Sequence, residues 1–175
     1  MNDLFVPLLV LVLVFTLVIV FTGMFISSIR FGIPYVPTKR LLVKKMHELA
    51  DLKKGQTVYD LGCGDGVLLR KFPENQYVLK GVEGDLFVFL WAKLLSYRRS
   101  DICYMRQNFF KLSIEDANAV LLYTAPHIMK QIEKKIWPQL KTGTKVISNT
   151  FSFPEIEPIS VSKVGKVKVF LYVKN

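Results

Sequence analysis

One short stretch, residues 58–66, constrains the fold of this chain more than any other and reads V-Y-D-L-G-C-G-D-G. An apolar run ends there in an acid, Asp60, and glycines follow at positions 62, 64 and 66. Glycine adopts positive φ at little cost and lets a ligand lie against bare backbone. The pattern therefore predicts a buried strand over Thr57–Leu61, a tight turn, and a short helix over 66–71.

Strand-like and helix-like segments alternate along the rest of the chain. Strand patterns cover 57–61, 77–83, 101–105, 118–123 and 145–150, and helical patterns cover 38–52, 66–71, 85–95 and 126–137. Such alternation is typical of an α/β fold, a parallel sheet covered by helices. Two further strand patterns, 156–162 and 166–173, flank Val164 and Gly165 and predict a C-terminal antiparallel hairpin.

The acids around the glycine turn indicate which ligand it holds. Glu83 ends the next strand, 21 residues after Gly62, where a carboxylate can accept hydrogen bonds from the two hydroxyls of a ribose. A dinucleotide site has the same acid but needs a glycine at position 67, where this chain has Val67. Asp60 and Asp65 would repel a pyrophosphate, and they suit a ligand that carries an ammonium and a sulfonium group. We therefore expect the cofactor S-adenosylmethionine.

The first 30 residues differ in composition from the rest of the chain. No charged residue lies between Leu4 and Ile29. About 20 apolar residues cross a bilayer, so residues 1–30 are predicted to form a single transmembrane anchor. A cleaved signal peptide fits poorly because the start carries Asp3, the apolar run is too long, and no small-residue cleavage site follows. All Lys and Arg residues lie at or after residue 30, which places the remainder on the cytoplasmic side of the membrane.

Residues 31–37 are predicted to be a linker, and residues 38–175 a single domain. The 24 Lys and Arg residues outnumber the 14 acids, and this excess suits an anionic lipid surface. No basic run is interleaved with aromatic residues, so we expect no nucleic-acid partner. The cysteines lack metal-ligand spacing and neither histidine has a second ligand nearby in sequence, so no metal site is predicted. The sequence leaves the oligomeric state open.

The stretch 58–66 resembles the first motif of the class I S-adenosylmethionine-dependent methyltransferases, and Glu83 resembles their ribose-binding acid. The apolar N-terminus, then P-Y-V-P-T over 34–38 and a helix leading into the turn, resembles the small membrane-associated protein lysine methyltransferases. That family includes mitochondrial enzymes acting on the adenine nucleotide translocase and on the c-ring protein of ATP synthase, and has prokaryotic relatives. The resemblance covers roughly residues 33 to 154. It implies a Rossmann-like sheet and, in a eukaryote, the mitochondrial inner membrane.

The resemblance also implies the roles of the residues that bind the cofactor. Asp60 corresponds to the acid that holds the methionine amino group, and Glu83 to the acid that binds the ribose. Asn108 stands where the family usually has an Asp facing the adenine amine, and its carbonyl oxygen can accept the same bond without the charge. The ring of Phe109 packs either against the adenine or in the core. The expected cofactor-binding residues are Asp60, Gly62, Gly64, Asp65, Glu83, Asn108 and Phe109.

Two tyrosines are the catalytic candidates. Tyr123 follows the fourth strand, with Thr124 and Pro126, where this class contacts the methyl acceptor. The sequence there is not the Asn/Asp-Pro-Pro-Tyr signature of amide, adenine or glutamine methylation, and a core role for Tyr123 is an equal alternative. Tyr35 is the second candidate, because the segment 34–37 is expected to fold over the cofactor.

The implied activity is methyl transfer to a lysine of a membrane or membrane-proximal protein. Such a transfer mainly requires alignment of the nucleophile and exclusion of water. The lysine must also lose its proton, which desolvation or a nearby acceptor assists. Asn149 and Thr150 are weaker site candidates. Two alternatives stay open: methylation of a lipid amine or quinone, and a cofactor-binding or interaction protein without catalysis.

Overall fold

The computed structural model describes residues 5–31 and 40–175, without the side chains of residues 20, 21 and 24–31. The chain divides into two units, Met1–Tyr35 and Val36–Asn175. The first unit contains one described helix, α1 (Phe5–Phe31), and its described apolar side chains are largely exposed. Across the described residues, no helix meets the length and apolarity that crossing a membrane requires. The transmembrane anchor predicted over 1–30 is therefore not supported by the structure.

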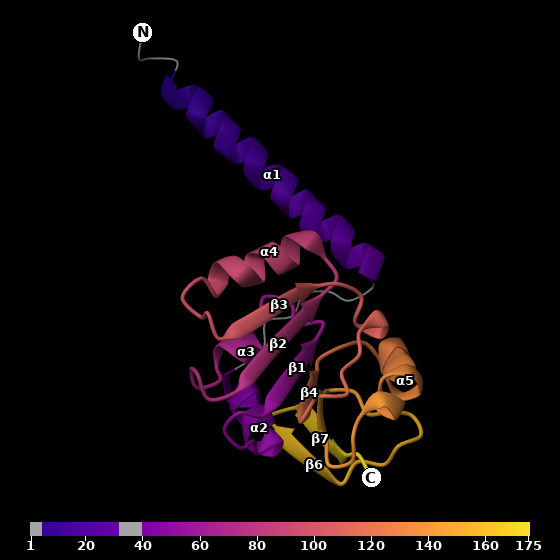
Figure 1. Ribbon diagram of the computed structural model, residues 1–175. Coiled ribbons are helices and arrows are strands. Elements are labelled where there is room, and N and C mark those ends of the chain that lie inside the picture. The colour runs from indigo at the N-terminus through magenta and orange to yellow at the C-terminus, as the bar shows by residue number, and fades with distance from the viewer. Residues whose placement is uncertain (1–4, 32–39) are drawn as a thin grey trace. The chain divides into compact units, whose positions relative to one another are not determined.

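A seven-stranded sheet with the strand order β3-β2-β1-β4-β5-β7-β6 forms the centre of the second unit (Figure 1). Strands β1 to β5 run parallel, whereas β7 is antiparallel to β5 and to β6. The predicted α/β sheet with a C-terminal antiparallel hairpin is thus confirmed. The strands are β1 (Thr57–Leu61), β2 (Val78–Glu83), β3 (Ile102–Arg106), β4 (Ala119–Leu122), β5 (Lys145–Asn149), β6 (Ser160–Val164) and β7 (Val167–Val173).

Helices cover both faces of the sheet. Neighbouring residues of a strand point to opposite faces, and the buried apolar residues accordingly form two clusters. Val58 and Leu121 pack in the cluster beneath α2 and α3, whereas Leu61 and Val120 pack in the cluster beneath α5. The helices of this unit are α2 (Arg40–Ala50), α3 (Val67–Arg70), α4 (Leu86–Leu95), α5 (Pro126–Lys135) and the 3-10 turns η1 (Phe109–Lys111) and η2 (Trp137–Gln139).

The largest error in the predicted elements concerns the strand expected over 156–162, because β6 begins only at Ser160. A side chain from α5 explains the difference. One carboxylate oxygen of Glu133 accepts the backbone N–H groups of Glu155 and Ile156, at 2.9 and 2.8 Å. Those N–H groups are therefore engaged outside the sheet, and Pro158 has no N–H to offer.

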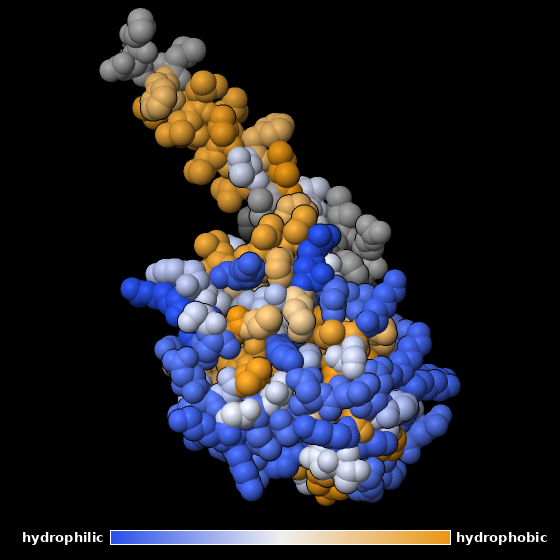
Figure 2. Space-filling view, in the orientation of Figure 1, coloured by the Kyte–Doolittle hydropathy of each residue, from blue (hydrophilic) through white to orange (hydrophobic). Residues whose placement is uncertain are grey.

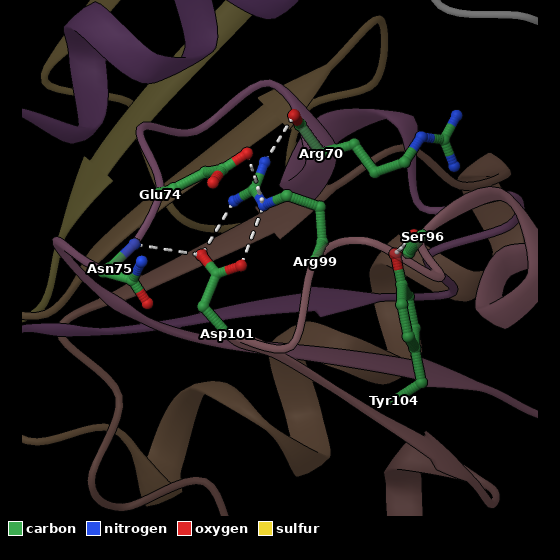
Figure 3. A network of polar contacts seen from close by, with 7 residues as sticks. All are labelled: Arg70, Glu74, Asn75, Ser96, Arg99, Asp101 and Tyr104. Atoms are coloured by element: carbon green, nitrogen blue, oxygen red, sulfur yellow. Dashed lines mark hydrogen bonds and ion pairs between the residues drawn. The ribbon is translucent and has the colours of Figure 1, made fainter.

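An ion-pair network joins the loop after α3 to the segment before β3 (Figure 3). Arg99 donates from Nε and Nη2 to the two carboxylate oxygens of Asp101, each at 2.8 Å, and from Nη1 to the carbonyl of Arg70 at 2.7 Å. Glu74 lies 3.8 Å from Arg99 Nε, and the N–H of Asn75 donates to Asp101 at 3.3 Å. The Arg99 and Asp101 side chains are only 10% and 8% exposed, so this pair is shielded from solvent.

Replacing Arg99 by Met should lower the free energy of unfolding at pH 7 by about 1.5–3 kcal/mol, the range for hydrogen bonds to charged groups. The guanidinium holds the pKa of Asp101 below its ordinary value. A carboxyl group with a lowered folded-state pKa stabilises the fold above its unfolded pKa, and that stabilisation disappears as the pH falls through its folded-state pKa. Urea unfolding should therefore show a wild-type advantage at pH 7 that shrinks in acid. Lys44→Met, at an exposed ion pair of 3.9 Å with Glu48, should change stability little at either pH.

Candidate active site

The glycine turn after β1 lies against the carboxyl end of β2. The N–H groups of Gly62 and Cys63 both donate to the carbonyl of Val82, at 2.8 and 3.1 Å. Gly62, Gly64 and Gly66 have φ values of 75, 57 and 76°. Side chains rarely adopt this left-handed region, so the glycines allow the chain to turn sharply at the edge of the sheet.

Glu83, the last residue of β2, is hydrogen-bonded to the turn. One carboxylate oxygen accepts the N–H of Gly64 at 3.1 Å, and the other accepts the N–H of Asp85 at 2.9 Å. Burial raises the pKa of Glu83, and these backbone donors oppose the rise. A carboxylate oxygen can accept more than one hydrogen bond. Glu83 therefore keeps acceptor capacity for ligand hydroxyls, and its ribose-binding role stays a prediction.

Asp60 is buried beneath the turn, with only 2% of its surface exposed. Its Oδ2 atom has no hydrogen-bond partner among the described residues. Burial, and then the charges of Glu83 and Asp65, raise the pKa of Asp60 to about 8. A buried carboxylate without a partner is costly, and a bound cation removes that cost. The site therefore fits a ligand with an ammonium group, such as the amino-acid end of S-adenosylmethionine.

Asp65 is engaged within the turn itself. Its Oδ1 accepts the N–H of Val67 at 3.0 Å, and its Oδ2 lies 3.2 Å from a guanidinium nitrogen of Arg70. Arg70 also donates to the backbone carbonyl of Asp65. These contacts hold the glycine turn against α3, and direct contact of Asp65 with the cofactor stays a prediction.

Asn108 and Phe109 follow β3 at the same edge of the sheet. Asn108 is exposed and caps η1, because its Oδ1 accepts the N–H of Phe110 at 2.9 Å. The rings of Phe109 and Phe110 lie 4.5 Å apart and pack, partly buried, on the cluster beneath α5. Capping and core packing thus account for the visible contacts of these residues, and their adenine contacts stay predictions.

Unpaired polar atoms gather where β1, β4 and β5 end. Besides Asp60 Oδ2, the buried atoms Thr124 Oγ1 and Asn149 Nδ2 have no hydrogen-bond partner among the described residues. Sequence reasoning gave Thr124 and Asn149 little weight, because nothing in the sequence shows that these side chains are buried and unpaired. Tyr123 lies beside them and is half-buried, whereas Tyr35 falls outside the described residues. The three unpaired atoms mark the carboxyl edge of the sheet as the candidate site.

Replacing Glu83 by Ala should weaken binding of S-adenosylmethionine by about 1–3 kcal/mol, from the loss of charge-assisted hydrogen bonds. Isothermal titration calorimetry measures the change. Because Glu83 also holds the N–H of Gly64, thermal unfolding of the variant should be measured alongside. The exposed Glu48→Ala serves as the control and should leave the affinity unchanged. An unaltered affinity in Glu83→Ala would place the ribose elsewhere.

Comparison with known proteins agrees with this site. The family described as "ANTKMT methyltransferase domain" matches residues 60–160. A "Protein-lysine N-methyltransferase" of Saccharolobus islandicus is 30% identical over 150 residues, covering 81% of this chain and 93% of that protein. The mouse "Adenine nucleotide translocase lysine N-methyltransferase" is 28% identical over 148 residues, covering 82% of this chain and 64% of the mouse protein.

Solved structures agree as well. An RNA methyltransferase from Salinibacter ruber, crystallised with S-adenosyl-L-homocysteine, superposes with a TM-score of 0.73 at 25% identity, covering 79% of this chain and 94% of that one. A methyltransferase from Geobacter sulfurreducens in complex with the same compound superposes with a TM-score of 0.56 at 16% identity, which shows the shared fold. The chain therefore belongs to the ANTKMT methyltransferase domain family and is an S-adenosylmethionine-dependent methyltransferase.

Proposed function

We propose that this enzyme methylates the side-chain amine of a lysine in a membrane or membrane-proximal protein. The observation that carries the proposal is the unpaired, buried oxygen of Asp60 at the glycine turn, which fits the ammonium group of the methyl donor. The choice of a lysine acceptor is supported by the relatives, because the Saccharolobus and mouse proteins are both named as lysine N-methyltransferases. Relatives from Xenopus laevis and human are likewise named as lysine N-methyltransferases, of the c-ring protein of ATP synthase.

In this proposal the carboxyl edge of the sheet holds the cofactor along its length. Asp60 binds the amino group, Glu83 binds the ribose hydroxyls, and the backbone of Gly62 and Gly64 lies against the ligand. Asn108 and Phe109 contact the adenine, and Asp65 supports the turn. The bound sulfonium supplies a methyl group that is already activated, so the protein has to align the acceptor and exclude water.

Tyr123 is proposed to orient the acceptor amine. Replacing Tyr123 by Phe removes one hydroxyl and should lower kcat about tenfold, the equivalent of one lost hydrogen bond, without changing the affinity for the cofactor. Tyr77→Phe, at another half-buried tyrosine, should leave kcat unchanged. If Tyr123→Phe alters stability and leaves kcat intact, Tyr123 has only a packing role.

Labelling of membranes tests the proposed reaction. Membranes from cells that lack this gene are incubated with the full-length enzyme and methyl-labelled S-adenosylmethionine, with the Asp60→Asn variant as the inactive control. Label is expected in protein, and mass spectrometry of peptides is expected to place it on lysine. Label found only in the lipid extract would instead support a lipid amine or quinone as the acceptor.

Membrane attachment through residues 1–30 is a further part of the proposal, with a linker over 31–37, a catalytic domain over 38–175, and that domain on the cytoplasmic side. The absence of charge from residue 4 to residue 29 supports it, as do the exposed apolar side chains of α1, such as Leu11 and Phe15. Alkaline carbonate extraction should leave the full-length protein in the membrane pellet. Release into the supernatant would contradict the attachment.

A further inference from the structure

Helix α4 carries a continuous row of exposed apolar side chains, which we call the α4 surface. Its members are 39–61% exposed and comprise Leu86, Phe87, Leu90, Trp91, Leu94 and Leu95. Of the helix, only Ala92 is fully buried. Figure 2 shows apolar residues over the helix labelled α4 in Figure 1, with hydrophilic residues beside them.

The spacing of these residues makes the α4 surface one broad face. Leu86, Leu90 and Leu94 follow one another at intervals of four residues, and so do the three members that come one position later. A helix on the surface of a soluble domain normally directs its polar side to solvent. Contiguous exposed apolar residues mark an interaction site, whereas single ones are ordinary. The α4 surface is therefore expected to have a partner.

The charges around the α4 surface indicate the kind of partner. Residues 86–100 contain three cations and no acid. Lys93 and Arg98 are exposed and lie over the rings of Phe89 and Tyr97, each 5.6 Å from the ring centre. Long cationic side chains that run along apolar surface bring their charge to the level of lipid head groups, and Trp and Tyr are enriched at that level.

We propose that α4 lies in the surface of an anionic lipid bilayer, with the α4 surface in the acyl boundary and Lys93 and Arg98 at the head groups. An apolar face flanked by cations is the composition of helices that bind membranes in this way. Anionic lipid adds attraction for each cation near the surface. A protein partner with a purely apolar face would leave these cations without a counter-charge.

This placement would bring the candidate active site to the membrane. Asp85 caps α4, since its Oδ1 accepts the N–H of Val88 at 2.8 Å, and its own N–H donates to Glu83 at 2.9 Å. The N-terminal end of α4 is thus joined directly to the carboxyl edge of β2. The enzyme would then present its site to lysines that lie close to the lipid surface. Only this last step rests on the proposed function.

Fluorescence of Trp91 in the full-length protein tests the docking. Replacing the other tryptophan, Trp137, by Phe leaves Trp91 as the single reporter. The protein is reconstituted into vesicles of neutral or of partly anionic lipid, each containing brominated acyl chains. Trp91 emission should shift to the blue and be quenched by bromine in anionic vesicles, and less so in neutral ones. Emission that stays open to acrylamide and insensitive to bromine in both would overturn the proposal.

Two substitutions with matched exposure complete the test. In the same background, Leu94→Glu, at a side chain 61% exposed, should reduce the bromine quenching to the level of neutral vesicles, whereas Ile159→Glu, at one 64% exposed, should leave it intact. Equal effects of the two would contradict a specific role of α4. Protection of Trp91 from acrylamide before lipid is added would mean that protein covers the α4 surface, which also overturns the proposal. Quenching requires no methyl transfer, so it can be measured in the Asp60→Asn variant whether or not the proposed reaction is correct.

Discussion

The Asp60→Asn variant is expected to lose affinity for S-adenosylmethionine about a hundredfold, on the scale for removing one partner of a buried charge pair. The same substitution should stabilise the cofactor-free protein at pH 8. Both effects have one cause, because the carboxylate that suits a cationic ligand is buried without a partner in the described structure. Asn has nearly the same shape, so its effect reports on charge. Titration calorimetry measures the first effect and urea unfolding the second.

The pH dependence of stability follows from the pKa of Asp60, which is about 8 in the fold, against about 4 in an unfolded chain. Between these two values the folded state binds more protons than the unfolded state does. The contribution of this group to stability is therefore present below pH 4 and decreases as the pH rises, by up to about 1.4 kcal/mol per unit. The Asn variant should lack this slope, so the two stability profiles should diverge from pH 5 to pH 8. Parallel profiles would contradict the raised pKa.

Binding of the cofactor should release a proton below about pH 8. A cation bound beside Asp60 favours its ionised form and lowers its pKa, so the affinity should increase with pH up to that point. Calorimetry in two buffers with different ionisation enthalpies measures the proton release directly. The wild-type protein should show a buffer-dependent binding enthalpy, and the Asp60→Asn variant should not.

The sequence predicted the part of the site that depends on local patterns. The bounds of β1, Thr57–Leu61, agree with the prediction because a parallel strand covered on both faces is a short apolar run that ends at a turn. The positions of Gly62, Glu83 and Tyr123 at one edge followed from the alternation of strands and helices. Each of these inferences uses only residues that are close together in the chain.

Features that depend on distant contacts were not predictable in the same way. The late start of β6 depends on Glu133, more than twenty residues upstream of the N–H groups that it binds. The burial of Thr124 and Asn149 depends on how neighbouring elements close over the strand ends. The exposure of α4 was also hidden, because an apolar helix in an α/β sequence is normally expected to be buried.

The second large effect is expected for Gly66→Ala, which should lower the free energy of unfolding by about 2–4 kcal/mol, the sum of backbone strain and overpacking. Gly66 has a φ of 76°, and an added Cβ would lie 2.0 Å from the hydroxyl oxygen of Tyr104. That hydroxyl is in turn hydrogen-bonded to Ser96 at 2.9 Å (Figure 3). Tyr104 therefore cannot move aside without losing a contact with the end of α4. Urea unfolding measures the loss.

Gly165→Ala separates the two contributions, because Gly165 also has a positive φ, 62°, but nothing lies within 4 Å of an added Cβ. It should cost only the backbone strain, about 1–2 kcal/mol. Shortening the opposing side chain with Tyr104→Leu should recover part of the loss in Gly66→Ala and none in Gly165→Ala, which a double-mutant cycle measures. Equal losses in the two glycine variants would mean that Tyr104 yields freely. The glycine at 66 would then serve the turn through its φ alone, and the close packing of Tyr104 would not require it.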